Sequence, residues 1–159
     1  MSKSQGKVAV VTGGSRDIGR ATSMKLAKEG AKVVVNYFNS EEEGNETVSL
    51  IKENSGEAIA AYADVTNQDD INNLVAQTKI TFGEKIDILL NNSGGLFARK
   101  SNEEVDISFY ELVMNVDFKS AVFVTQAFKP LINLDGTVIN LSSQAARWRS
   151  WWFYLVCYF

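Results

Sequence analysis

The chain has 159 residues, 45% of them hydrophobic, and a net charge of −3, so it can form one domain with a buried core. This composition excludes a disordered chain, and the scattered lysines and arginines give no basic surface for nucleic acid. A single cysteine, Cys157, excludes an intrachain disulfide and a cysteine-based zinc site, and histidine is absent. Because the sequence has no signal peptide and no apolar span of about twenty residues, we expect a cytoplasmic protein that does not contact membranes.

The first thirty residues predict a strand, a glycine-rich turn and a helix. Residues 7–12 form a short β-branched run typical of a buried parallel strand, which Gly13 and Gly14 end. Apolar residues at helical spacing begin at Ile18 and continue to a stop signal at Gly30. Because the N–H groups at the start of such a helix point toward one place, this unit predicts a phosphate-binding loop.

The rest of the chain alternates between strands and helices. Strands are expected at residues 31–36, 57–63, 86–91 and 137–141, and helices at residues 41–54, 67–82 and from 105 to about 132. Pro130 and the pair Asp135-Gly136 are expected to end the last, long helix. This order predicts an α/β fold, a Rossmann-type doubly wound parallel sheet with ligands at the carboxyl ends of its strands.

Three motifs at the ends of these strands resemble those of the short-chain dehydrogenase/reductase family. Residues 12–19 resemble its TGxxxGxG loop, residues 91–94 its NNAG motif, and Ser142 and Ser143 its catalytic-serine segment. The resemblance covers residue 6 to about residue 147. It implies an oxidoreductase that uses a nicotinamide dinucleotide to move a hydride to or from a small carbonyl or alcohol substrate, through an Asn-Ser-Tyr-Lys tetrad.

The resemblance also implies a cofactor site. Its residues are Gly13, Ser15, Arg16, Asp17, Ile18, Gly19, Asn36, Asp64, Val65, Asn91, Ser93 and Gly94. Gly13 and Gly19 would let the backbone approach the pyrophosphate, unless they only shape the turn. Asp64 would receive the adenine amino group while Val65 packs on the ring, unless Asp64 or Thr66 caps the following helix. Residues 91–94 would border the ribose, although a tight turn favours the same residue types.

The choice between NAD and NADP stays open. Asp17 stands where the family usually has glycine, and its carboxylate would repel a pyrophosphate unless it turns away, for example to cap the helix. Arg16 either meets the 2′-phosphate of NADP or is a solvated loop residue. Asn36 replaces the aspartate that would hold the ribose diol of NAD, and Phe38 stands where NADP-preferring relatives often have arginine.

Two residues are candidates for a catalytic role. Ser143 matches the serine that hydrogen-bonds the substrate carbonyl, unless its hydroxyl only satisfies backbone at the strand end. Asp117 stands at the position of the catalytic asparagine. Asn115 lies two residues earlier, and because two such helical residues point about 200° apart, it cannot simply substitute.

After residue 147 the family pattern stops. The family has Tyr-x-x-x-Lys about a dozen residues after the serine, but neither Tyr154 nor Tyr158 has a lysine four residues later. Codons can be chosen for residues 148–159 that give Tyr-x-x-x-Lys in the neighbouring frame, so a frameshift is one hypothesis; an evolved aromatic tail that packs on the sheet or docks at a membrane is the other.

We therefore expect residues 1–147 to be a Rossmann domain truncated after its fifth strand, followed by an aromatic tail. The chain would be catalytically incomplete, and its unpaired last strand would cause self-association. The alternatives are a cofactor-binding pseudoenzyme or interaction module, or a non-functional truncation product.

Overall fold

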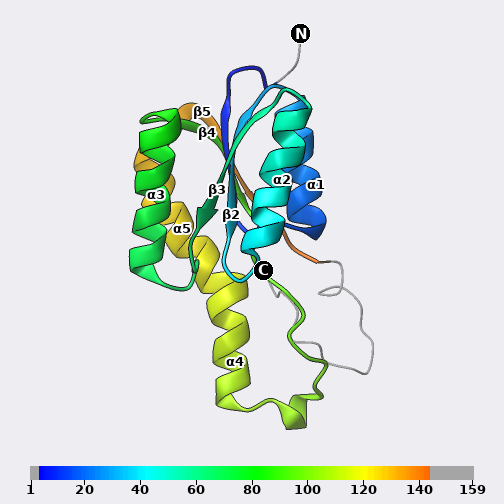
Figure 1. Ribbon diagram of the computed structural model, residues 1–159. Helices are drawn as coiled ribbons and strands as arrows, with labels where there is room; N and C mark the ends of the chain where they lie inside the picture. The colour runs from blue at the N-terminus through cyan, green and yellow to red at the C-terminus, as the bar shows by residue number, and fades with distance from the viewer. Residues whose placement is uncertain (1–3, 144–159) are drawn as a thin grey trace.

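The computed structural model describes residues 4–143 and consists of one parallel sheet with helices on both faces (Figure 1). The strand order is β3-β2-β1-β4-β5. The strands are β1 (Val8–Val11), β2 (Lys32–Tyr37), β3 (Glu57–Tyr62), β4 (Ile86–Asn91) and β5 (Ile132–Asn140). The helices are α1 (Asp17–Lys28), α2 (Glu41–Glu53), α3 (Gln68–Phe82), α4 (Ile107–Met114) and α5 (Ser120–Phe128). The predicted α/β doubly wound fold is confirmed, with the first four strands and three helices within one or two residues of their expected bounds.

The core consists of two apolar layers, one on each face of the sheet. Alternate residues of a strand point to opposite faces, so Val8 and Val10 of β1 pack toward α3 and α5, and Ala9 and Val11 pack toward α1 and α2. On the α3 side the helices contribute Leu74 and Phe128, among others. Burial on both faces explains why β1 and β2 are continuous β-branched runs.

The direction in which the chain extends the sheet reverses at β1. From β1 the chain passes through α1 to β2, on one side, while β4 pairs with β1 on the other side. In sheets of this kind, ligands bind in the crevice at this reversal, beyond the carboxyl ends of the strands. The loop after β1 therefore occupies the expected position of a ligand site.

The expectation of one continuous helix from residue 105 to about 132 is wrong. A short turn, η1 (Asn102–Glu104), comes first, and the Asp106 side chain then caps α4 by accepting a hydrogen bond from the backbone N–H of Phe109 (2.7 Å). A π-helical turn, η2 (Asn115–Lys119), separates α4 from α5, and a last turn, η3 (Lys129–Leu131), contains Pro130. The helical path is therefore interrupted at the candidate residue Asp117.

The last strand also differs from expectation, because it begins at Ile132 rather than at residue 137. Its pairing with β4 shifts from Ile86↔Ile132 to Ile88↔Thr137, so an irregularity takes up the extra residues. Asp135 and Gly136 lie in this irregularity instead of ending the helix. A β-bulge favours the same turn-forming residue types as the end of a helix.

Candidate cofactor site

The loop after β1 is tied to the end of β2 by Asn36. The backbone N–H of Gly13 donates to Oδ1 of Asn36 (3.1 Å), and the N–H of Gly14 donates to its carbonyl oxygen (2.8 Å). Gly13 has φ +58°, in the left-handed region where glycine has no steric cost. The turn therefore has the shape that the glycine motif predicts.

The same loop is held from the other side by the segment after β4. The buried Thr12 hydroxyl oxygen accepts hydrogen bonds from the backbone N–H groups of Asn92 (2.9 Å) and Ser93 (3.0 Å). The Asn92 side-chain amide donates to the carbonyl oxygens of Thr12 (2.9 Å) and Gly13 (3.0 Å). Thr12 lies in the glycine motif and Asn92 in the motif after β4, and their hydrogen bonds join the two motifs, a role that the motif pattern alone does not predict.

Gly19 lies in the first turn of α1, directly against the loop. A Cβ atom at Gly19 would lie 2.0 Å from the carbonyl oxygen of Gly13 and 2.8 Å from Nδ2 of Asn92. These atoms belong to the protein, so glycine is required at this position by the chain's own packing, whatever else the loop contacts.

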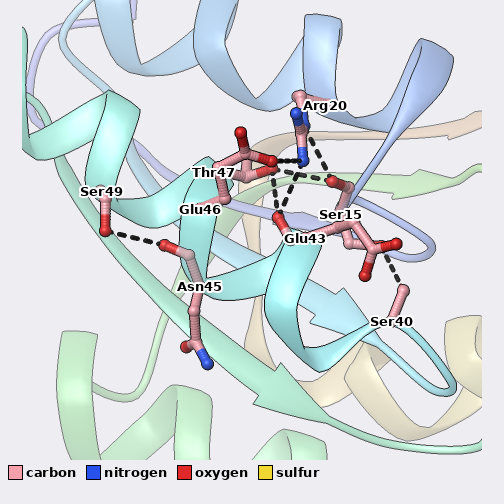
Figure 2. A network of polar contacts seen from close by, with 8 residues as sticks. All are labelled: Ser15, Arg20, Ser40, Glu43, Asn45, Glu46, Thr47 and Ser49. Carbon is pink, nitrogen blue, oxygen red and sulfur yellow. Dashed lines mark hydrogen bonds and ion pairs between the residues drawn. The ribbon is translucent and has the colours of Figure 1, made fainter.

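A network of polar contacts fixes the second half of the loop to α2 (Figure 2). The carbonyl oxygen of Ser15 accepts hydrogen bonds from Nε of Arg20 (3.0 Å) and from the hydroxyl of Thr47 (2.8 Å). The Ser15 hydroxyl contacts that of Ser40 at 2.7 Å, in a buried position before α2. Arg20 also pairs with the Glu46 carboxylate (2.6 Å), so its charge is already matched within the protein.

The start of α1 exposes Arg16, Asp17 and Ile18. Arg16 takes the N-cap position but its side chain makes no capping hydrogen bond. An α-helix begins with N–H groups that lack partners in the helix, so this end has donors suited to an anion. Asp17 has φ +49°, in the left-handed region that favours glycine, the residue expected at this position of the glycine motif. Its carboxylate also places a negative charge in the first turn of α1.

Asn36, expected near the ribose, is buried between β2 and β3. Only 2% of it is exposed, and its side-chain amide donates to the carbonyl oxygens of Ala61 (3.3 Å) and Ala63 (3.0 Å). The next side chain, Tyr37, is half-buried, and burial together with the neighbouring Glu41 carboxylate raises the pKa of its hydroxyl. Asn36 therefore supports the loop through hydrogen bonds from within the sheet and is not exposed to a ligand.

Asp64 and Val65 follow β3. The Asp64 carboxylate accepts hydrogen bonds from the backbone N–H (2.8 Å) and the hydroxyl (2.7 Å) of Thr66. The cap of α3 is Asn67, whose side chain accepts from two backbone N–H groups of the first turn, so the expected alternative of a cap by Asp64 or Thr66 is wrong. Val65 lines an open cavity of about 390 Å³ that also contacts Lys119 and Phe123.

The residues at and beyond the end of β4 divide into a buried and an open group. Asn91 is buried, and its amide donates to the hydroxyl of Thr125 (2.9 Å) and to Oδ1 of Asn140 (2.7 Å), beneath α5. Ser93 is half-buried, and its hydroxyl lies 3.3 Å from where a Cβ at Gly13 would be. Gly94 is exposed at the same edge of the sheet.

The two candidate catalytic residues lie beyond the carboxyl ends of β4 and β5. Asp117, in η2, accepts a hydrogen bond on Oδ1 from the backbone N–H of Gly95 (3.0 Å), which joins the π-helical turn to the loop after β4. A side chain at Gly94 would crowd this contact, because its Cβ would lie 2.9 Å from the same oxygen. Ser143 is exposed just beyond β5.

Within residues 4–143 no group of three or more histidine, cysteine, aspartate or glutamate side chains could hold a metal ion. In the same part of the chain, none of the helices has the length and apolar character needed to cross a membrane.

The sequence matches the family model described as short chain dehydrogenase over residues 7–155. The chain belongs to this family. Among curated relatives, an uncharacterized oxidoreductase of Methylorubrum extorquens is 41% identical over 143 residues, which are 90% of this chain and 57% of the relative. A hydroxynaphthalene reductase-like protein of Metarhizium robertsii is 36% identical over 141 residues, which are 89% of this chain and 52% of the relative. The chain thus spans slightly more than half the length of these short-chain dehydrogenase relatives.

Solved structures of short-chain dehydrogenases have the same fold. A dehydrogenase/reductase from Sinorhizobium meliloti 1021 matches with a TM-score of 0.89 and 32% identity, covering 95% of this chain and 59% of that one. A short chain dehydrogenase from Burkholderia cenocepacia J2315, solved in complex with NADP, matches with a TM-score of 0.85 and 32% identity, covering 92% of this chain and 59% of that one. The family match ends within residues 144–159, which lie outside the described residues, so the expected boundary at residue 147 stays a prediction.

Proposed function

We propose that this chain carries the nucleotide-binding part of an NAD(P)-dependent oxidoreductase whose intact form acts on a carbonyl or alcohol carbon. The observation that carries the proposal is the loop between β1 and α1, which lies at the reversal point of the sheet and leads into a helix without a side-chain cap. The oxidoreductase relatives and the NADP complex of the Burkholderia protein support it.

The proposed dinucleotide lies across the crevice with its pyrophosphate at the start of α1. The adenosine half extends over β2 and β3, toward Asp64 and Val65, because the first strand–helix–strand unit of such folds holds the adenine ribose. The nicotinamide half then extends over β4 and β5, toward Ser93 and Gly94. When bound, nicotinamide supplies or accepts the hydride.

Arg16 and Asp17 set the electrostatics at the entrance of this site. Because the Arg20 guanidinium is paired with Glu46, Arg16 is the residue of this loop that would meet a 2′-phosphate. The Asp17 carboxylate would repel any nearby phosphate, because both are negatively charged. NAD and NADP are both proposed as cofactors, and the titration described below ranks them.

For the chemical step, Ser143 is proposed to hydrogen-bond the substrate carbonyl, and Asp117 to take the position of the family's catalytic asparagine. The chain carries no Tyr-x-x-x-Lys after Ser143, so it lacks the expected proton donor and is proposed to be inactive as it stands. Residues 148–159, where the pair would fall, lie outside the described residues. A cofactor-binding pseudoenzyme would differ from a non-functional product by binding nucleotide without turnover.

The test is a thermal-shift titration with NAD⁺, NADH, NADP⁺, NADPH and ADP-ribose. Arg16→Glu should reduce the shift that each nucleotide induces, because it replaces a positive charge at the pyrophosphate entrance by a negative one. Lys28→Glu makes the same change of charge at the other end of the 12-residue helix α1, about 18 Å away, and should leave the shift intact. If no nucleotide stabilises the unmodified chain, the proposal fails.

Self-association is also proposed, through the outer edge of β5. This strand pairs with β4 on one side, and the described sheet ends with it on the other. Leu134 and Val138 of β5 are exposed. An unpaired strand edge with exposed apolar residues pairs readily with a second copy.

A further inference from the structure

Within residues 4–143, no helix covers the face of β4 and β5 on the α1–α2 side of the sheet. The helices of that side pack elsewhere: α1 contacts β1 and β2, and α2 contacts β2 and β3. α5 packs against β5, but from the opposite face of the sheet (Figure 1). Apolar side chains on this face of β4 and β5 are therefore exposed.

The strand register identifies these side chains. Ile139 pairs with Leu90, which belongs to the apolar layer beneath α1 and α2, and partners in neighbouring strands point to the same face. By alternation Leu141 shares that face with Ile139, and each is 45% exposed. Ile88, paired with Thr137, is partly buried on the same face and extends the apolar surface toward the core.

The segment that follows has the composition and position to cover this surface. Residues 148–159 contain seven aromatic side chains together with Leu155 and Val156. Only six residues separate Leu141 from Trp148, so in extended form the connection spans at most about 25 Å, and the segment begins within reach of β5. Tethering of this kind gives an effective concentration on the order of millimolar, which favours contact within one chain.

We propose that residues 148–159 dock on the face formed by Ile88, Ile139 and Leu141, and so cover the apolar side of β4 and β5. This apolar face and the outer backbone edge of β5 are different surfaces. Docking on the face leaves the edge available for the self-association proposed above.

Tryptophan fluorescence tests this directly, because all three tryptophans, Trp148, Trp151 and Trp152, lie in the proposed docking segment. The emission maximum of the unmodified full chain should lie at shorter wavelength than that of tryptophan in water, with slow acrylamide quenching. Both should be independent of protein concentration. The double variant Ile139→Asp/Leu141→Asp should shift the emission toward that of tryptophan in water and increase quenching severalfold. Ile80→Asp, at a position 86% exposed on α3 across the sheet, is the matched control and should change neither.

A second measurement needs no substitution. Cys157 is the chain's single cysteine, so a nitroxide attached to it should broaden the amide signals of Ile88, Ile139 and Leu141 and leave that of Ile80 sharp. Water-like emission in the unmodified chain, or sharp signals at these three residues, would overturn the proposal. A blue shift that grows with protein concentration would assign the face to a second copy, and one seen only with lipid vesicles would assign the segment to a membrane; either result also overturns it.

Discussion

Replacing Gly19 by alanine should destabilise the fold itself, independently of any nucleotide. The new Cβ would lie 2.0 Å from the carbonyl oxygen of Gly13, whereas carbon–oxygen contacts are ordinarily about 3.3–3.6 Å. The two segments must separate by more than about 1 Å, which strains the hydrogen bond from the Asn92 amide to Gly13 (3.0 Å). Overpacking costs about 1–3 kcal/mol and the hydrogen bond about 1 kcal/mol, so we expect a loss of about 2–4 kcal/mol.

The assay is urea and thermal unfolding of the full chain without ligand. For a chain of this size the expected loss corresponds to a fall in Tm of roughly 5–15 °C. Gly95→Ala is the matched control: a Cβ there meets nothing within 4 Å, and its N–H still donates to Asp117, so the cost should stay within about 0.5 kcal/mol. A Gly19→Ala chain as stable as the Gly95→Ala chain would refute the reasoning and return Gly19 to a role in ligand contact alone.

Four further outcomes are expected. The chain should show no measurable carbonyl reduction, because a general acid contributes about 10²–10⁴-fold and no lysine-assisted tyrosine follows Ser143; turnover abolished by Ser143→Ala would contradict this. Thr12→Val should lower the free energy of unfolding by about 2–3 kcal/mol, since the N–H groups of Asn92 and Ser93 lose their acceptor, whereas Thr12→Ser should cost less than about 1 kcal/mol in the same urea titration. Asp17→Gly and Asp17→Asn should both tighten nucleotide binding severalfold in calorimetry by removing a charge, and weaker binding would reveal a positive role for the carboxylate. Analytical ultracentrifugation at micromolar concentration should detect self-association, and a compact monomer across that range would rule out the β5 edge as an interface.

The alternation of strands and helices could be predicted because each early element has its own local signal. The β-branched runs of β1 and β2 are buried on both faces, and Gly30 ends the first helix region. Between residues 107 and 128 the sequence has no proline or glycine, so nothing local marks the π-helical turn. Asp135-Gly136 correctly predicts a break in regular structure, but the same residue types occur at helix ends and in β-bulges. Only the pairing of β5 with β4 shows that the break is a bulge.

The site was predictable where a motif fixes the backbone, and less so where a side chain's direction matters. Asn36 is the last residue but one of β2 and Asn91 is the last residue of β4, yet both side chains are buried. Strand parity carries the missing signal: Asn36 shares the face of Val34 and Asn91 that of Leu89, and both of these apolar residues belong to the layer under α3 and α5. The role of Gly19 in packing depends on how closely two segments approach, which no spacing rule contains. The roles of the candidate site residues toward a cofactor stay predictions.

The buried amide of Asn36 links the order of the loop to the pairing of two strands. Its oxygen accepts a hydrogen bond from the N–H of Gly13, while its nitrogen donates to the carbonyl oxygens of Ala61 and Ala63. Because one buried side chain makes all of these hydrogen bonds, we expect motions of the loop to be coupled to the pairing of β2 with β3. Hydrogen exchange at Gly13 should then follow the cooperative opening of the sheet rather than the fast fluctuations of a surface loop. The loop after β1 should then be as persistent as the two strands that Asn36 joins, and should become disordered only when they separate.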